Sequence, residues 1–244
     1  IAGNWSDSGA FNANGRAVFF NGASTQTITN TSGETYSYLI HNGAGLLQFN
    51  NNISVSGNSG DVLQLLAGTI DLNGKNLTLS GTGGNIKITG SQILDSSISG
   101  SVLNITNGLK TVTSGNLTIP SNVTTVLNNG INFGNNLTTI QGILRIATGG
   151  YVQTNAPIYT NTSTLEYNGV TGFGVTSEWT GSATTVGVGV PNNVVLTNNA
   201  SINMPDVINS PRSASTITIG SGSTLVQGAT QNYADLIVFG AGAA

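Results

Sequence analysis

The stretch NLTLSGTGGNIKITG, residues 76–90, places two short runs of alternating apolar and polar residues on either side of a small polar turn. The first run is Leu-Thr-Leu (77–79) and the second is Ile-Lys-Ile (86–88). Strict alternation is typical of a β-strand with one buried face, and Gly, Ser and Asn are residues that turns favour. The stretch therefore predicts two very short strands joined by a tight turn.

The composition of the whole chain also favours β-structure. Only 6% of the 244 residues are charged, whereas an ordinary globular protein has about 25%. The polar residues are instead 32 Asn and 57 Ser or Thr, together with 34 Gly. Disordered chains usually carry high net charge and few β-branched residues, and Asn, Ser, Thr and Gly are weak helix formers. Because Ile, Val and Thr are abundant and regularly placed, we expect an all-β fold.

Charge and hydropathy exclude several classes of protein. The net charge is -3, and the six Lys and Arg residues are scattered singly, so we expect no nucleic acid partner. The sequence contains no apolar run long enough to span a membrane. Because it also contains no cysteine, a disulfide framework and thiolate metal sites are excluded. The absence of cysteine fits a secreted bacterial surface protein, and it also fits the many cytosolic proteins that lack cysteine.

Short strands continue along the chain in the same style. Alternating runs recur roughly every seven to ten residues between Leu46 and Ile146. Strands this short do not form stable hairpins, but in a solenoid each one pairs with its counterpart in the next coil. The shared rhythm of residues 68–81, 114–130 and 134–150 indicates three-faced coils of roughly 20–25 residues, about ten or eleven in all. We therefore predict a single-stranded parallel β-helix, that is, a β-solenoid.

Alternation also assigns side chains to the inside or the outside of the solenoid. The predicted core residues are Leu63, Leu65, Ile70, Leu72, Leu77, Leu79, Ile86, Ile88, Leu103, Ile105, Leu117, Ile119, Leu144 and Ile146. The predicted outward residues are Gln64, Asp71, Thr78, Lys87, Asn104, Thr118 and Arg145. We expect Asn at equivalent turns to stack in amide ladders.

We expect residues 1–244 to form one β-helical segment of a larger chain, with longer loops in 156–211. The first residues, IAGNWSDSG, lack the basic head and apolar core of a signal peptide. Neither end of the sequence resembles a cap over unpaired strand edges. Further β-helix or other domains of the same polypeptide are therefore the expected partners at both ends.

Four stretches carry a resemblance to a known family: GNWSDSGAFNANGRAVFFNGASTQTIT (3–29), LLAGTIDLNGKNLTLSG (65–81), GYVQTNAPIYTNTSTLEYNGVTGFGVTSEW (150–179) and GVPNNVVLTNNASINMP (189–205). They resemble the repetitive, adhesin-like cell-surface proteins of the Bacteroidota that the type IX secretion system exports. The resemblance covers most of the chain and implies an extracellular β-helical body within a much larger polypeptide. It also implies surface polysaccharide or the secretion machinery as a partner. No stretch here matches the sorting domain that the family carries at its far C-terminus.

Catalytic chemistry has few candidates in this sequence. A glycosidase needs two facing carboxylates, and the spacing places Asp61 near Asp71 and Asp71 about one coil from Asp95. We interpret these acids as solvated surface residues, and the single histidine, His41, as a turn or surface residue without a triad motif. The stretch GNSGD (57–61) lacks the repeat that binds calcium in β-helices. We therefore predict no catalytic residue, no metal site and no cofactor.

One group of acidic and aromatic residues suggests a contact with glycan or another surface. Aromatic rings can stack on sugars while neighbouring carboxylates accept hydrogen bonds from sugar hydroxyls. The candidate contact residues are Tyr159, Glu166, Tyr167, Phe173, Glu178 and Trp179. In the alternative interpretation, Leu165 and Tyr167 point into the core and Trp179 fixes a loop.

The leading functional hypothesis is a non-catalytic, extracellular structural or adhesive segment that acts as a rigid spacer at a cell surface. The first alternative is a carbohydrate-active β-helix enzyme of the polysaccharide lyase or hydrolase type, which requires acids and bases clustered on adjacent coils. The second alternative is an ice-binding solenoid, which requires Thr-x-Thr at one fixed place in successive coils.

Overall fold

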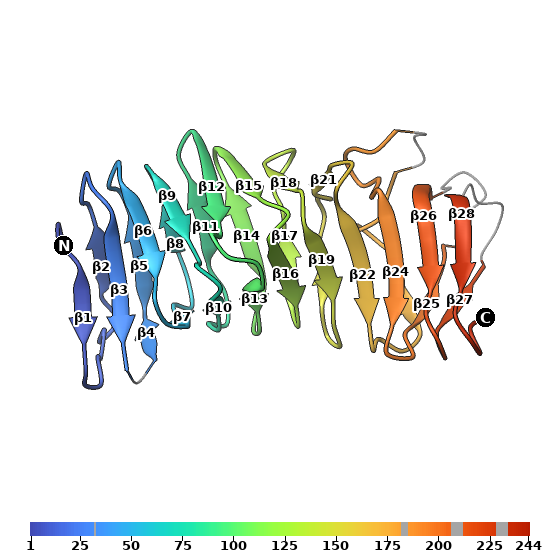
Figure 1. Cartoon of the computed structure of the whole chain (residues 1–244), viewed down its shortest axis with the longest axis horizontal. Helices are drawn as coiled ribbons and strands as arrows, with labels where there is room; N and C mark the ends of the chain where they lie inside the picture. Colours follow the sequence, from blue (N-terminus) through green and yellow to red (C-terminus); the bar gives the residue numbers. More distant parts are fainter. Residues whose placement is uncertain (32, 182–184, 206–211, 228–233) are drawn as a thin grey trace.

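The computed structural model describes residues 1–31, 33–181, 185–205, 212–227 and 234–244. The described residues contain 28 β-strands and no helix. The strands stack along one axis into an elongated body of about 9 turns, with the two termini at opposite ends (Figure 1). No helix that could cross a membrane occurs among these described ranges.

Three long sheets form the faces of the solenoid, and each takes one strand from each coil it covers. The eight-stranded sheet contains β1 (Trp5–Asp7), β3 (Gln26–Asn30), β6 (Leu46–Phe49), β9 (Thr69–Asp71), β12 (Ser91–Asp95), β15 (Asn116–Ile119), β18 (Thr138–Ile140) and β21 (Ile158–Tyr159). The seven-stranded sheet contains β2 (Ala17–Phe20), β5 (Tyr38–His41), β8 (Asp61–Leu65), β11 (Asn85–Ile88), β14 (Lys110–Thr113), β17 (Gly130–Asn132) and β20 (Tyr151–Val152).

Of the three long sheets, only the third face continues through the last coils within the described residues. This ten-stranded sheet contains β4 (Glu34–Tyr36), β7 (Ile53–Val55), β10 (Asn76–Leu79), β13 (Ser101–Ile105), β16 (Val123–Leu127), β19 (Ile143–Ile146), β22 (Thr164–Asn168), β24 (Asn193–Thr197), β26 (Ala214–Ile219) and β28 (Ala234–Phe239). A small fourth sheet, in the order β23 (Phe173–Gly174), β25 (Ser201–Asn203) and β27 (Thr224–Val226), accompanies it there.

Every ladder between these strands is parallel, which confirms the predicted parallel β-helix. The coils vary in length more than we predicted. Register partners on the ten-stranded sheet range from 19 residues apart, for Glu34 and Ile53, to 29 apart, for Leu165 and Val194. The number of turns, about 9, is lower than the predicted ten or eleven.

The core is a continuous column of apolar side chains enclosed by the sheets. All fourteen predicted core residues are at most 2% exposed, so alternation located the core correctly. Six of the seven predicted outward residues are partly exposed. The prediction that Asp71 is solvated was wrong, because its side chain is only 3% exposed. Hydrogen-bonding groups from the neighbouring coils cover it, as described below.

Turns bring the backbones of successive coils into close contact. Gly108 has a φ of +56°, and a Cβ atom there would lie 1.8 Å from the carbonyl oxygen of Thr82 in the preceding coil. Asparagine side chains join adjacent coils at other corners, for example from Asn128 Nδ2 to Asn104 Oδ1 at 2.9 Å. Each of these side-chain hydrogen bonds joins two neighbouring coils. Together they continue the hydrogen bonding between coils beyond the ends of the strands.

The long loops expected in 156–211 lie partly outside the described residues, at 182–184 and 206–211. Within the described part, the chain leaves the regular coil after β23. An isolated antiparallel bridge between Ile158 and Val188 holds this excursion against the body, and a second bridge, between Gly187 and Val190, lies within the excursion itself. The excursion accounts for the 29-residue coil between Leu165 and Val194.

Candidate functional site

The residues predicted to contact glycan lie mostly inside the solenoid. Their exposed fractions are 0% for Tyr167, Glu178 and Trp179, 2% for Tyr159 and 8% for Glu166. Phe173 is partly buried, and its ring packs on Tyr167 with a centroid distance of 5.5 Å. The prediction of an exposed acid–aromatic patch was therefore wrong, since the rings of Tyr159, Tyr167 and Trp179 are buried and not available for a sugar to stack on. The alternative interpretation, with Leu165 and Tyr167 in the core, agrees with their complete burial.

Glu178 joins the excursion to the core through a buried hydrogen-bond network. Its Oε1 accepts bonds from the Tyr167 hydroxyl and the Thr176 backbone N–H, both at 3.0 Å. Its Oε2 accepts a bond from Thr176 Oγ1 at 3.0 Å, and its backbone carbonyl accepts one from the Tyr159 hydroxyl at 2.7 Å. Burial raises the pKa of the Glu178 carboxyl above its usual value, although these hydrogen bonds oppose the shift. The network is structural, because every group in it is directed toward another part of the chain.

Trp179 fixes the same excursion from its other side. Its side chain is fully buried, and its Nε1 donates a hydrogen bond of 2.9 Å to the carbonyl oxygen of Ser213. This contact connects the excursion to the residue just before β26. The aromatic and acidic residues thus serve to attach an irregular coil to a regular body.

Glu166 lies on the outer side of β22, where it connects three coils. Its oxygens accept hydrogen bonds from Arg145 Nε at 2.8 Å, Thr197 Oγ1 at 2.8 Å and Asn168 Nδ2 at 3.1 Å. Burial alone would raise the pKa of Glu166, but the hydrogen bonds and the positive charge of Arg145 lower it below its usual value. Glu166 is therefore an ionised structural acceptor.

The structure brings two of the three candidate catalytic acids together. Asp71 and Asp95 are register partners on β9 and β12. Asp71 accepts hydrogen bonds of 2.8 Å from the side chain of Gln48 and from the backbone N–H groups of Asn73 and Ser97. Burial would raise the pKa of Asp71, but these bonds lower it. A carboxylate with its oxygens occupied in this way holds turns together and is poorly suited to proton transfer.

Asp61 and His41 also interact with other groups of the protein. Asp61 lies on a different face from Asp71, where it forms an ion pair of 3.3 Å with Lys87. The prediction that His41 is a turn or surface residue was wrong, because it is fully buried in β5. Its Nε2 lies 3.0 Å from the carbonyl oxygen of Gly45, and burial lowers its pKa.

Sequence reasoning missed a buried lysine. Lys110 is 0% exposed, and its Nζ donates hydrogen bonds to the carbonyl oxygens of Gly81 at 2.6 Å and Asn107 at 2.7 Å. Desolvation lowers its pKa to about 8. Alternation with the buried Val112 was the signal that could have shown Lys110 to face inward.

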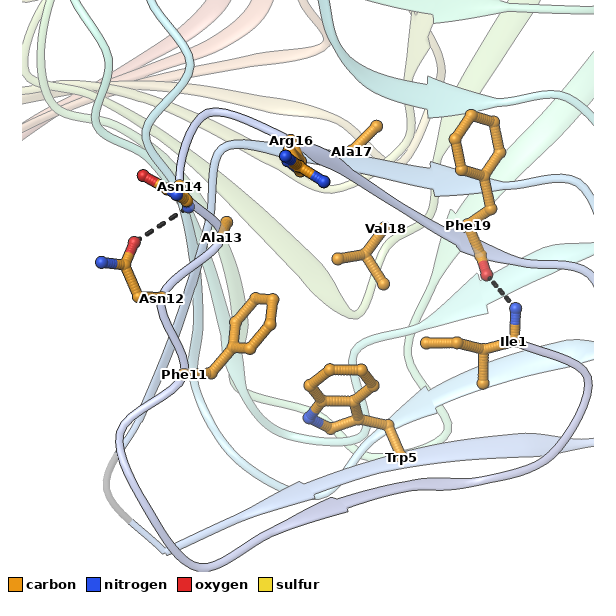
Figure 2. A pocket seen from close by; sticks show the side chains of 10 residues that line it. All are labelled: Ile1, Trp5, Phe11, Asn12, Ala13, Asn14, Arg16, Ala17, Val18 and Phe19. Atoms are coloured by element: carbon orange, nitrogen blue, oxygen red, sulfur yellow. Dashed lines mark hydrogen bonds between the residues drawn. The ribbon is translucent and has the colours of Figure 1, made fainter.

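Sequence reasoning also missed a cavity of about 580 Å³ at the N-terminal end. Figure 2 shows Trp5, Phe11 and Val18 directed toward this shared space, with Phe19 and Ile1 beside it. The aromatic residues of the first coil were the available signal. Among the described residues, no group of three or more His, Cys, Asp or Glu side chains could hold a metal ion.

The fold and the arrangement of ionisable groups define the class of the protein as a parallel β-solenoid whose ionisable side chains largely connect its coils. The chain matches no protein-family model, and no match was found among curated proteins or solved structures.

Proposed function

We propose that this chain is a non-catalytic, extracellular structural segment, acting as a rigid spacer with adhesive capacity on its outer faces. The observation that supports this proposal is the stack of about 9 parallel coils, which extends the protein in one dimension. Such a shape suits reach and display. In this role, the two ends of the rod meet further solenoid coils.

The hydrogen bonds that the charged groups form within the protein also support a structural role. Asp71, Glu166 and Glu178 each accept hydrogen bonds from neighbouring turns or coils. Lys110 binds backbone carbonyl groups of two successive coils. Catalysis usually depends on preorganised charges directed at a substrate, whereas these charges are directed at the protein itself.

A carbohydrate-active enzyme is the second candidate, because Asp71 and Asp95 are neighbours on adjacent coils. Two carboxylates about 5 Å apart would suit a retaining glycosidase. Asp71 is only 3% exposed, however, and its pKa is lowered, which disfavours a role as general acid. An ice-binding surface has less support. On the eight-stranded sheet, an outer column mixes threonine with aliphatic residues, in the order Leu46, Thr69, Ile93, Thr118, Thr139 and Ile158.

A polysaccharide degradation screen combined with a glycan array tests the proposal. The purified chain is expected to release no reducing ends or unsaturated products from any polysaccharide. Asp71→Asn and Asp95→Asn variants serve as matched controls, because they remove the acid pair while keeping the side-chain shape. Cleavage that disappears in these variants would overturn the non-catalytic role and favour the enzyme.

A further inference from the structure

The stacking of the sheets is interrupted at one place inside the rod. Within the described residues, the seven-stranded sheet ends at β20 and the eight-stranded sheet ends at β21. The first strand of the fourth sheet, β23, pairs with β25 and not with β20. The junction is the boundary between the coil of β19, β20 and β21 and the coil of β22 and β23. Of the sheets in the described part of the chain, only the ten-stranded one crosses it, through β19 and β22.

The junction is expected to be a weak interface between coils. In a solenoid each coil contacts only its neighbours, so stability is approximately a sum over the coils and the interfaces between them. At the junction the ladder between β19 and β22 supplies parallel backbone hydrogen bonds on one face. On the other two faces, β20 and β21 have no parallel partner beyond them in the described residues. Other contacts must therefore hold the next coil in place.

The excursion after β23 supplies such contacts to the coil before the junction. The Gly189 N–H donates a hydrogen bond to the carbonyl oxygen of Pro157, and the Tyr159 N–H donates one to the carbonyl oxygen of Gly187, both at 3.0 Å. The Tyr159 hydroxyl donates a third to the carbonyl oxygen of Glu178 at 2.7 Å. An antiparallel contact with the excursion thus takes the place of the next parallel strand beside β21.

The same excursion also binds the chain beyond the junction. Trp179 Nε1 donates a hydrogen bond of 2.9 Å to the carbonyl oxygen of Ser213, and the Ser213 N–H donates one of 3.2 Å to the carbonyl oxygen of Gly181. Ser213 directly precedes β26. The excursion therefore connects the last strand of the eight-stranded sheet to coils on the far side of the junction.

The described residues of the excursion form two limbs, 176–181 and 185–190, that close against each other. The N–H groups of Thr180 and Gly181 donate hydrogen bonds to the carbonyl oxygen of Gly189 at 3.1 Å and 2.8 Å. Gly189 has a φ of +63°, and a Cβ atom there would lie 2.0 Å from Thr180 Oγ1. The limbs can approach this closely because residue 189 is glycine.

We propose that the two limbs form a clasp that locks the junction, and that opening of the clasp lets the coils from β22 onward move relative to the preceding coils. The clasp is closed in this structure. The ladder between β19 and β22 does not involve the clasp, so it remains as the hinge when the clasp opens. The inference rests on the proposed function, because a solenoid acts as a rigid spacer only if its junction is locked.

Spin-label distances across the junction test the clasp. Labels attached to Ser59→Cys and Ser221→Cys occupy exposed positions on opposite sides of the junction. The distance distribution is expected to be narrow in the otherwise unmodified chain and broader in Gly189→Ala, because the added Cβ forces the limbs apart. Gly172→Ala is the matched control, since Gly172 has a φ of +60° but nothing within 4 Å of its Cβ position. In this control the distribution is expected to stay narrow.

Hydrogen exchange distinguishes opening of the clasp from a general loss of stability. In Gly189→Ala, the amides of Tyr159 and Ser213, which bind the limbs, are expected to exchange faster, while the amides of β10 and β13 keep their rates. If Gly189→Ala does not fold, Trp179→Phe takes its place. This variant keeps an aromatic ring but removes the hydrogen bond to Ser213, and the same broadening and local exchange are expected.

The possible outcomes separate the clasp from the spacer role. A distribution as narrow in Gly189→Ala and Trp179→Phe as in Gly172→Ala would overturn the clasp and leave the rigid spacer in place. Exchange that accelerates equally in every strand would also overturn the clasp. A broad distribution in the unmodified chain would contradict the locked junction and the rigid spacer together.

Discussion

Thr125 is a polar residue at a core position. It is 0% exposed, its register partners on the adjacent strands are Leu103 and Leu144, and its hydroxyl has no hydrogen-bond partner within the described part of the chain. An unpaired buried hydroxyl costs about 1–3 kcal/mol. Thr125→Val, which keeps the shape, is expected to raise the free energy of unfolding by about 1 kcal/mol in urea denaturation. Thr124→Val, at the neighbouring outward residue, is expected to have little effect. A less stable Thr125→Val protein would contradict this description of the core.

Lys110 makes stability depend on pH in the alkaline range. Its pKa is lowered from 10.5 to about 8 in the folded protein. Between these values the unfolded chain binds more protons than the folded chain, so the contribution of Lys110 to stability rises as pH rises. The unfolding free energy of the unmodified protein minus that of Lys110→Met is expected to increase from pH 8 to 10, by at most about 1.4 kcal/mol per pH unit. A difference that is constant or that falls would contradict the buried position of Lys110.

At this scale, the sequence predicts the apolar core but not its polar exceptions. Alternation places Leu77 and Ile86 inside, because the apolar positions of an alternating strand form its buried face. Asp71, His41 and Lys110 are buried because backbone or side-chain groups of neighbouring turns and coils supply hydrogen bonds to them. Those partners lie up to 29 residues away in the sequence, so local pattern alone does not reveal them.

The turns are the elements that limit how closely coils can stack. Gly108 combines a φ of +56° with a Cβ position that lies 1.8 Å from a backbone oxygen. Gly108→Ala is therefore expected to lower the free energy of unfolding by roughly 2–4 kcal/mol, through both backbone strain and displacement of a coil. Gly60→Ala separates the two effects, because Gly60 has a φ of +69° but open space around its Cβ position. Chemical denaturation should show a loss of only about 1–2 kcal/mol for Gly60→Ala. Equal losses in the two variants would contradict the close approach at Gly108.

At the scale of elements, the sequence predicts where the strands lie, but it does not predict how many residues each coil contains. Each strand must alternate to cover the core, which makes β10 and β11 recognisable from residues 76–90 alone. The corners tolerate insertions, because additional residues project outward without disturbing the ladders. The coil between Leu165 and Val194 contains such an insertion.

At the scale of the whole molecule, the prediction of an exposed glycan contact was wrong because another segment covers the residues. Glu178 and Trp179 lie in an excursion that folds back on the body, and Tyr159 and Tyr167 lie beneath it. Whether an aromatic residue is exposed depends on this covering segment, which the sequence pattern does not place. The solenoid itself was predictable, because it follows from many short strands that each need a partner in another coil.

If the chain is one rigid rod, a spin-label distance measurement should find one fixed separation between distant coils. The sequence has no cysteine, so labels attached to Ser59→Cys and Ser221→Cys report only these two exposed positions. The positions follow β7 and β26, which are seven coils apart in the ten-stranded sheet. At about 4.8 Å per coil, a rigid rod is expected to give one narrow distance distribution centred at about 34 Å along the axis. A broad distribution, or one centred far from this value, would contradict the rigid rod.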